Sequence, residues 1–479
     1  MDIIALISTL VEELFQAEQE FYERPGKMSA FEEAVSNASH RMAADYIKLT
    51  LEGMDEMFRK SVKRKQSYNI HRKDCRTLIT TVGDVTFERT LFQERDTKKY
   101  RYILDDVIGL PDHERFSSLA EAKVLSEAEV HSYQHAADSL KINGQSISKV
   151  AVMEKVHGIT EELPPERKLP EDEKKCCEYL YIEADEDHIH RQKSGEVTGG
   201  MIGKLVYLFE GKQDVCEGRR ILIHPHYHGG LYPGSDGNRI LWETVQKYIE
   251  EHYQEDSLKR VYINSDGGNW IKAGKEYVRK SVLVADRFHL MKHINRVSRL
   301  MSDDADVAKG RFYKYIHKNK LEEIQGLLDE IKASSGCEEK VEEIRTYFVN
   351  NWEAIQRAFH DKKVLGCSAE GHVSSVYSER MSSRPMGWSE TGSDRMCRLR
   401  CYVRNYGREK LLDLVEYRRA QKCGEQRATG TYDYVERRPL KHYTEKKRQI
   451  MQNAEKLQAT IGGVTVRKVI SIREQLGLL

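Results

Sequence analysis

The order of strand-like and helix-like segments between residues 176 and 290 constrains the fold more than any other part of the sequence. Three runs, CCEYLYIEADEDHIH, IGKLVYLFEG and RRILIHPHYH, have the apolar or alternating character of strands. RILWETVQKYIEEHY then has the apolar spacing of an amphipathic helix, and KRVYINSDGG follows as a fourth strand. WIKAGKEYV is a short helix and SVLVADRF a fifth strand. We therefore expect an α/β sheet of five strands.

This order, three strands, a helix, a strand, a helix and a strand, is that of the ribonuclease-H-like topology, a mixed five-stranded sheet with helices on both faces. In that arrangement Asp185 and Asp266 lie at the carboxyl ends of adjacent central strands. The composition, with 39% hydrophobic residues and only 9 Pro in 479 residues, is typical of a folded, helix-rich protein. It excludes collagen-like and largely disordered classes.

The rest of the chain divides by pattern around this α/β core. The predicted organisation is an N-terminal helical and β-hairpin region (1–105), a helical region with a candidate helix-turn-helix DNA-binding domain (106–160), a linker rich in Pro and charge (161–175), the first part of the core (176–290), an all-helical insertion (291–365), the completion of the core with a third acid (366–405) and a basic helical C-terminal region (406–479). In the first region, Gly83 and Asp84 can turn between two alternating strands.

The candidate helix-turn-helix consists of two helical patterns and a short break. LAEAKVLSEAEVHSYQHAADSL and SISKVAVMEKVH flank the break KINGQ, which contains Gly144. Such a pair can read DNA, with Lys149 among the contacts, or can be an ordinary helical hairpin that only packs. Both interpretations stay open.

Charge is segregated locally although it balances over the whole chain. Lys and Arg number 77 against 76 Asp and Glu, a formal charge of +1, so the global balance predicts no partner. The strip FRKSVKRKQSYNIHRKDCR holds eight Lys or Arg and one Asp, and residues 395–448 hold 16 against 7, a balance of 16 − 7 = +9. These segments can follow a phosphate backbone, with a solvated surface as the alternative.

Nothing in the sequence predicts a membrane protein or a secreted protein. No run of 18 apolar residues occurs, and the first residues lack a basic segment before their apolar ones. The nine Cys suit free thiols in a reducing cytoplasm. Zinc sites at Cys176 and Cys177, at Cys397 and Cys401, or at the three histidines of HPHYH (His224, His226 and His228) are weaker interpretations than packing or turn roles.

Acidic residues at neighbouring strand ends suggest metal-dependent chemistry. Such residues repel one another unless cations neutralise them, and two Mg²⁺ ions about 3.5–4 Å apart are the usual solution in nucleases and polymerases. Our candidate ligands are Asp185, Asp266 and Glu370, with Asp187 as a substitute for Asp185 because it lies on the same face of the strand. Each is alternatively a turn or cap residue.

Several strings resemble those of the ISLre-type insertion-sequence transposases, a bacterial DDE family. They are YILDDVIGLPDHERFS, YIEADEDHIHRQ, VYINSDGGNWIKAG, VADRFHLMKHI and GCSAEGHVSSVYSERMSSRPMGWS, in order over most of the chain. The resemblance implies a DDE core that uses two Mg²⁺ or Mn²⁺ ions to cut and join DNA at the ends of a mobile element. It also implies double-stranded DNA, both element ends and target, as the partner, a homo-oligomer, and a bacterial cytoplasmic protein that is nucleoid-associated when bound to DNA.

The DDE residues transfer onto this chain position by position. The first Asp is Asp185, the second is Asp266 in SDGGNW, and the Glu is Glu370 in SAEGHV, with Glu379 and Glu390 as nearby alternatives. The DRFH string resembles a Cys-or-Asp, two residues, His motif of mutator-like relatives, and Asp286 and His289 are its acid and its histidine. A capping Asp and a core His remain the alternative roles for this pair.

The resulting hypothesis is two-metal phosphoryl transfer without a covalent enzyme intermediate. Asp185 and Asp266 would hold the metal that activates a water or a DNA 3′-hydroxyl, and Asp185 and Glu370 the metal at the leaving oxygen. Candidate phosphate contacts beside the site are Arg380, Arg384 and Arg395, and Trp388 is either a base-stacking or a core residue. The competing hypotheses are a silent DNA-binding relative and a ribonuclease-H-like nuclease without strand transfer.

Loss of the C-terminal basic cluster should weaken the salt dependence of DNA binding. The cluster is Arg437, Arg438, Lys441, Lys446, Lys447 and Arg448. Each phosphate contact that is removed lowers the slope of log K against log salt by roughly 0.9. We expect a flatter slope when the six residues are replaced by Ser, measured by fluorescence anisotropy over a salt series. An unchanged slope would take the cluster out of the interface.

Overall fold

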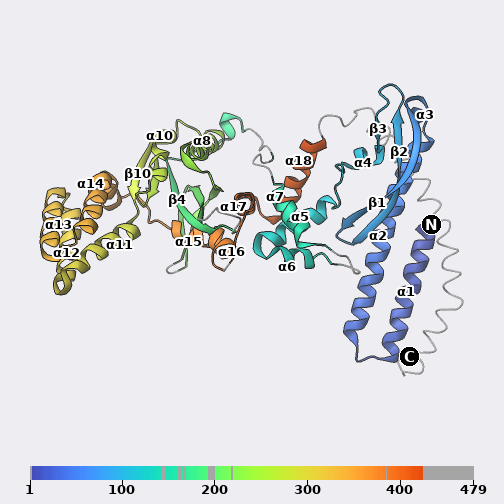
Figure 1. The fold of residues 1–479 in the computed structure, drawn as a ribbon, viewed down its shortest axis with the longest axis horizontal. Coiled ribbons are helices and arrows are strands. Elements are labelled where there is room, and N and C mark those ends of the chain that lie inside the picture. Colours follow the sequence, from blue (N-terminus) through green and yellow to red (C-terminus); the bar gives the residue numbers. More distant parts are fainter. Residues whose placement is uncertain are drawn as a thin grey trace. The chain divides into compact units, whose positions relative to one another are not determined.

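The computed structural model describes residues 3–141, 147–159, 164, 169–192, 200–216, 219–384 and 386–423 (Figure 1). The chain divides into two compact units, each described separately below. The first is Met1–Lys155 together with Leu411–Leu479, and the second is Val156–Lys410. Among the described helices, none combines the length and the apolar character needed to cross a membrane.

The first unit begins with a helical hairpin and a three-stranded sheet. Their elements are α1 (Ile3–Glu23), α2 (Met28–Lys60), α3 (Val62–Ser67), β1 (Tyr68–Thr80), β2 (Gly83–Glu94) and β3 (Tyr100–Arg101). Helices α1 and α2 lie side by side (Figure 1), and Arg41 pairs with Glu13 across the hairpin at 3.1 Å. The sheet packs on α2 through apolar residues that include Leu51, Val85 and Phe87. This part of the chain thus contains helices and a β-hairpin.

The hairpin turn lies two residues before its predicted place. Thr80 pairs with Gly83, so Thr81 and Val82 form the turn, and Gly83 is already the first residue of β2. The Thr80 hydroxyl donates to the Gly83 carbonyl at 2.7 Å and accepts from the Val82 amide at 3.2 Å. The Thr80 side chain therefore closes the turn. Gly83, the residue after the turn, has a backbone φ of 124°, which glycine adopts more readily than other residues.

A group of short helices completes the first unit. They are α4 (Ile103–Ile108), α5 (Ser118–Val130), α6 (Tyr133–Asp138), α7 (Lys149–His157) and α18 (Leu411–Cys423). The first helix of the candidate helix-turn-helix is broken at His131. There the Ser132 hydroxyl accepts a hydrogen bond from the His135 amide at 3.2 Å and begins α6. Ser148 begins α7 in the same way, by accepting from the Ala151 amide at 3.1 Å.

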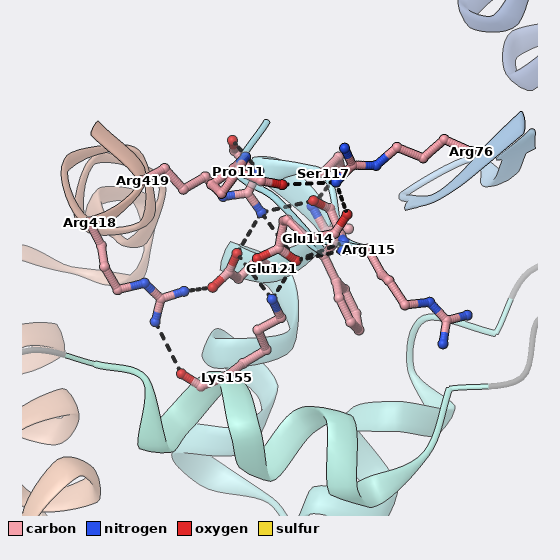
Figure 2. A network of polar contacts seen from close by, with 12 residues as sticks. Arg76, Pro111, Glu114, Arg115, Ser117, Glu121, Lys155, Arg418 and Arg419 are labelled. Atoms are coloured by element: carbon pink, nitrogen blue, oxygen red, sulfur yellow. Dashed lines mark hydrogen bonds and ion pairs between the residues drawn. The ribbon is translucent and has the colours of Figure 1, made fainter. Parts of the chain in front are cut away.

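Buried ion pairs bind α18 to α5 within this unit (Figure 2). Glu121 of α5 is completely buried and accepts from Arg419 at 2.5 Å and also from Arg418. Arg419 donates a further hydrogen bond to the Phe116 carbonyl at 2.8 Å. Lys155 donates a hydrogen bond to the Glu114 carboxylate. Although the sequence pattern groups residues 406–479 as one basic region, α18 belongs to the first unit by these contacts.

The second unit contains a five-stranded mixed sheet in the order β10-β9-β4-β5-β8. Its strands are β4 (Tyr179–His190), β5 (Gly200–Phe209), β8 (His226–Gly230), β9 (Arg260–Ser265) and β10 (Ser281–Ala285). Strands β4, β9 and β10 are parallel, whereas β5 is antiparallel to both β4 and β8. The predicted mixed five-stranded sheet is confirmed.

The third predicted strand is two strands. Its first half is β7 (Arg219–Ile223), which pairs with β6 (Gly211–Cys216) in a separate two-stranded sheet, and its second half is β8. His224 lies between them with a φ of 47°, a left-handed conformation that ends one strand before the other begins. The prediction of one continuous strand was wrong because apolar patterning does not reveal such a turn.

Helices cover both faces of the main sheet. On one face, α8 (Gly234–His252), α9 (Asn269–Lys272) and α10 (Gly274–Tyr277) pack on the even-numbered residues of β4, with Leu180, Ile182, Trp242, Val261 and Ile263 in the core. On the other face lie α15 (Ala369–Val373), the π-turn η3 (Ser374–Ser378), α16 (Glu379–Met381) and α17 (Glu390–Tyr406). Tyr377 of η3 contacts Gly203 of β5 and Gly229 of β8 on this second face.

The chain between β10 and α15 is helical, as predicted for the insertion. It consists of α11 (Arg287–Ser298), η2 (Arg299–Asp304), α12 (Ala305–His317), α13 (Leu321–Ser335) and α14 (Glu338–His360), and two further 3₁₀ turns lie elsewhere, η1 (Glu171–Glu173) and η4 (Arg408–Lys410). Phe312 and Phe348 stack in the helical core with ring centroids 5.7 Å apart. Helix α14 packs against β10, so the helices adjoin the edge of the sheet (Figure 1).

Replacing Glu121 by Gln should destabilise the first unit strongly. The substitution keeps the volume but leaves Arg418 and Arg419 buried without their carboxylate, a loss of about 3–5 kcal/mol. Glu88→Gln is the matched control, because the pair of Glu88 with Lys73 is exposed to solvent and its loss should change the stability little. Amide hydrogen exchange in α5 and α18 measures the effect. Equal exchange rates in the two variants would contradict it.

Candidate active site

Three aspartates lie at one level on three adjacent parallel strands. Glu183 of β4 pairs with Asn264 of β9, and Asn264 pairs with Val284 of β10. Two residues further along, each strand reaches an aspartate, and a step of two residues keeps the same face of the sheet. These residues are Asp185, Asp266 and Asp286. Asp266 and Asp286 directly follow the last residues of β9 and β10, whereas Asp185 lies inside β4, which continues to His190. The expected position at the carboxyl end of a strand therefore holds for Asp266 and not for Asp185.

The loop after β9 holds Asp266 in place. Its Oδ1 accepts a hydrogen bond from the Gly268 amide at 2.8 Å. Gly267 has a φ of 110°, and a Cβ there would lie 2.9 Å from the ring of Tyr347 on α14. The loop therefore requires glycine at this position, both for its backbone conformation and for the close approach of α14.

Asp286 and His289 form a hydrogen-bonded pair at the start of α11. The Asp286 carboxylate accepts from the Phe288 amide at 2.9 Å, which makes it the N-cap, and it contacts His289 Nδ1 at 2.7 Å. This bond, together with the negative charges of Asp286 and Asp266, raises the pKa of His289. Asp286 therefore caps α11 and also orients His289, whose pKa is raised in part by the charge of Asp266.

Asp185 is held in a partly dehydrated and negatively charged environment. Burial raises its pKa to about 6, and the nearby charge of Asp266 adds to this effect. A hydrogen bond from the Glu186 amide at 2.8 Å acts in the opposite direction. Two carboxylates whose charges disfavour each other in this way form a site that attracts cations.

Helix α15, which carries Glu370, is anchored to the same face of β4 as Asp185. The anchor is the completely buried Glu183, which accepts from the Ser368 amide at 2.7 Å and from the Ser368 hydroxyl at 2.9 Å. Further along the chain, the Ser382 hydroxyl donates to Asp187 at 2.8 Å. The segment from Ser368 to Ser382 is thus attached on both sides of Asp185.

The Glu370 side chain is exposed and does not complete a group of metal ligands with Asp185 and Asp266. Its side chain is 64% exposed, and Lys292 of α11 lies 3.9 Å from it. Among the described residues, the oxygens of Asp185, Asp266 and Glu370 do not form a group within 4.8 Å of one another. Glu390 pairs with Arg191 beyond the end of β4 at 3.2 Å, and Glu379 is exposed on α16. The structure brings the two aspartates together and leaves the glutamate open.

The buried network around Glu183 was missed by sequence reasoning. Its carboxylate also accepts from the Tyr207 hydroxyl and from Lys212 Nζ, the latter at 3.0 Å, and the Lys212 side chain is only 8% exposed. The available signal was the alternation of acids in YIEADED, which puts Glu183, Asp185 and Asp187 on one face. The partners of Glu183 lie far along the chain, so no local pattern predicts them.

Comparison with known proteins assigns the chain to a family. A sequence model of the Uncharacterised protein family (UPF0236) matches residues 27–417. One UPF0236 protein of Caldanaerobacter subterraneus subsp. tengcongensis is 32% identical over 400 residues, which cover 81% of this chain and 82% of the relative. Another from the same organism is 33% identical over 377 residues, 78% of each chain. The chain belongs to the UPF0236 family.

Two of the predicted DNA contacts of this UPF0236 protein are core residues. Trp388 is buried, and its Nε1 donates to the Met381 carbonyl at 3.0 Å. Arg380 is also buried, 4.9 Å from the ring centroid of Trp388. Of the two roles left open for Trp388, the structure favours the core one, and the phosphate contact predicted for Arg380 is wrong because that side chain is buried. The many Ser and Arg residues of this segment suggested an exposed surface, but the segment packs against the sheet.

The other predicted DNA contacts differ in exposure and in their partners. Arg395 pairs with Asp394 at 3.2 Å, whereas Arg384 is exposed and Lys149 is exposed at the first turn of α7. The C-terminal basic cluster, Arg437, Arg438, Lys441, Lys446, Lys447 and Arg448, lies outside the described residues. Arg384 and Lys149 are therefore the predicted contacts that the described surface leaves accessible.

The alternative zinc sites have ordinary packing roles. Burial raises the pKa values of Cys397 and Cys401, to about 12 for Cys401, which keeps both thiols protonated. Burial also lowers the pKa of His226 to about 2, and its ring stacks on Tyr248 at 3.8 Å. His224 instead bonds to Glu210 at 2.8 Å. The packing interpretation is the one that these contacts favour.

Replacing Asp266 by Asn should lower the pKa of Asp185 in metal-free protein. The pKa is expected to fall from about 6 while staying above the usual 3.8, because burial is the larger cause. Since the folded pKa exceeds the unfolded one, the stability that Asp185 contributes is lost as pH rises from 3.8 to about 6, and the variant loses less over that range. Carboxyl-carbon NMR titration measures the pKa. An unchanged value would mean that the two charges do not interact.

Proposed function

We propose that this UPF0236 protein is a metal-dependent DDE transposase that cuts and joins DNA at the ends of an insertion sequence. The observation that carries the proposal is the alignment of Asp185 and Asp266 on adjacent parallel strands, with the helix of Glu370 anchored over the same face. Phosphoryl transfer with two Mg²⁺ or Mn²⁺ ions needs carboxylates in such an arrangement. The strings that resemble ISLre-type transposases contain all three residues.

The sheet supports a ribonuclease-H-like core. Its order β10-β9-β4-β5-β8, in which β5 alone runs opposite to the other four strands, has the connections expected for that topology. We infer that β4 is its first and central strand, since it pairs with β5 on one side and β9 on the other. The helices α11–α14 then form an insertion between the fifth strand and the helix that carries the third acid.

The donor atoms at the site fit Mg²⁺ or Mn²⁺. Asp185 and Asp266 supply carboxylate oxygens, the ligands that hard divalent cations prefer, and their mutual repulsion is relieved when a cation binds. Bound metal ions would supply Lewis-acid stabilisation of the charge that develops at the phosphate. Glu370, exposed on the short helix α15, can complete the set by a change of side-chain rotamer or a small movement of that helix.

Other residues of the site would position the reacting groups. His289, held by Asp286 and close to Asp266, has a raised pKa and can donate a hydrogen bond to a phosphate oxygen or to a leaving hydroxyl. Lys292, one turn later on α11, is positively charged, and its Nζ lies 3.9 Å from a carboxylate oxygen of Glu370. Both side chains are suited to an anionic backbone rather than to a neutral substrate.

The relatives favour transposition over simple DNA cleavage. One UPF0236 protein has a name that joins eleven designations in a single organism, and another joins four. A sequence present in many copies in one genome is the expected product of an element that moves. We therefore favour strand transfer over a nuclease, with double-stranded DNA as partner, a homo-oligomer as the active form and the bacterial cytoplasm as its location.

The decisive experiment compares chemistry and binding on a duplex that carries the element's own end. We expect wild type to cleave it and join it to target DNA in Mg²⁺. Asp185→Asn, Asp266→Asn and Glu370→Gln should each lose at least about a hundredfold in rate while binding DNA normally, since they remove metal ligands rather than contacts to DNA. Gel-resolved cleavage and joining products give the rate, and anisotropy gives the affinity.

Glu379→Gln and Glu390→Gln are the matched controls, because both glutamates lie on the same segment but are exposed or paired elsewhere. If one of them is inactive and Glu370→Gln is active, the third ligand moves to that residue. If wild type binds DNA but never cuts it, the silent DNA-binding relative is the correct interpretation. Cutting without joining would instead indicate the nuclease.

A further inference from the structure

A second group of metal-ligating side chains lies in the first unit, at the corner between α5 and α6. The group is Glu127, His131 and His135, whose potential ligand atoms all lie within 4.8 Å of one another. It is the one group of at least three such residues found among the described residues. The two imidazole rings are tilted by 52° to each other, with centroids 4.3 Å apart. None of the three belongs to the aspartate site, which lies in the second unit.

The break between the two helices creates this group. Helix α5 ends at Val130, and the His131 amide still donates to the Glu127 carbonyl at 2.8 Å, so these two residues lie one helical turn apart. The Ser132 hydroxyl then begins α6 and fixes His135 by accepting from its amide at 3.2 Å. A continuous helix, as the sequence pattern predicted, would space the residues along one face. The corner instead directs all three toward one point.

We propose that Glu127, His131 and His135 bind a divalent transition-metal ion of the Zn²⁺ class. Two imidazole nitrogens and one carboxylate oxygen are a ligand set that suits zinc, with a fourth position left for water. Zinc bonds of about 2.0–2.1 Å in a tetrahedron put ligands about 3.3 Å apart, so small rotamer changes from the present separations suffice.

The surroundings of the group suit a cation from solution. Both histidines are exposed and Glu127 is half-buried, so an ion can enter from solvent. The group also lies at the C-terminal end of α5, where the last carbonyl groups carry partial negative charge. The ion would join the last turn of α5 to α6, and its binding would stabilise the corner between the two helices. Mg²⁺ is not expected here, because it prefers oxygen ligands.

The test is Zn²⁺ binding by the full chain, with any histidine tag removed and with Asp185→Asn and Asp266→Asn present to silence the aspartate site. Competition with a chromogenic chelator in excess Mg²⁺ gives the affinity and the number of ions. We expect one bound Zn²⁺ per chain. His131→Gln, His135→Gln and Glu127→Gln should each weaken binding at least about tenfold, since even outer-shell changes cost 10–100-fold.

The control is His71→Gln, which removes an exposed histidine of β1 in the same unit and should leave Zn²⁺ binding unchanged. Thermal melts in EDTA check that all variants fold alike, and Zn²⁺ should raise the melting temperature of the parent and of His71→Gln only. The proposal is overturned if the three variants bind Zn²⁺ as tightly as the parent, or if His71→Gln loses as much. Because the aspartate site is silenced throughout, the result does not depend on the proposed function.

Discussion

The in-register pairing of three parallel strands determines where the acidic residues of the second unit lie. Glu183, Asn264 and Val284 lie opposite one another on β4, β9 and β10, so the aspartates two residues later are held at one level. A slip of one residue in β4 would turn Asp185 to the opposite face, where Ile182 and Ala184 pack against α8. The apolar core on that face therefore maintains the alignment of the acids. The cost is a partly buried carboxylate, because burial, with a smaller addition from the charge of Asp266, raises the pKa of Asp185.

Glu183 connects this alignment to the rest of the site. A fully buried carboxylate requires donors on all sides, and it finds them in β5, in the β6-β7 hairpin and at the start of α15. Removing the charge would leave the buried Lys212 ammonium without a carboxylate partner, so the requirement is mutual. Three segments that are distant in the sequence are thereby held around the strand that carries Asp185.

The sequence predicted what depends on local periodicity and missed what depends on distant contacts. The mixed five-stranded sheet, the helices on both faces and the place of Asp266 after β9 follow from apolar periodicity and from an acid at a strand end. The turn at His224 was missed, because a left-handed residue leaves no apolar signal. Arg380 was predicted to be exposed because its segment is rich in Ser and Arg, but it is buried over the ring of Trp388, for which a core role was one of the two alternatives. The attachment of α18 to α5 depends on pairs nearly 300 residues apart.

Glu370 is the least constrained of the predicted ligands, for a physical reason. The anchors at Ser368 and Ser382 fix the backbone of its segment, but a glutamate on an exposed helical turn keeps its rotamer freedom. The π-turn η3 follows α15 directly, and such turns are often found at functional sites because they allow a helix to adjust. The three predicted ligands therefore differ in constraint: Asp185 and Asp266 are held by the backbone amides that they accept from, whereas Glu370 keeps a solvent-exposed side chain.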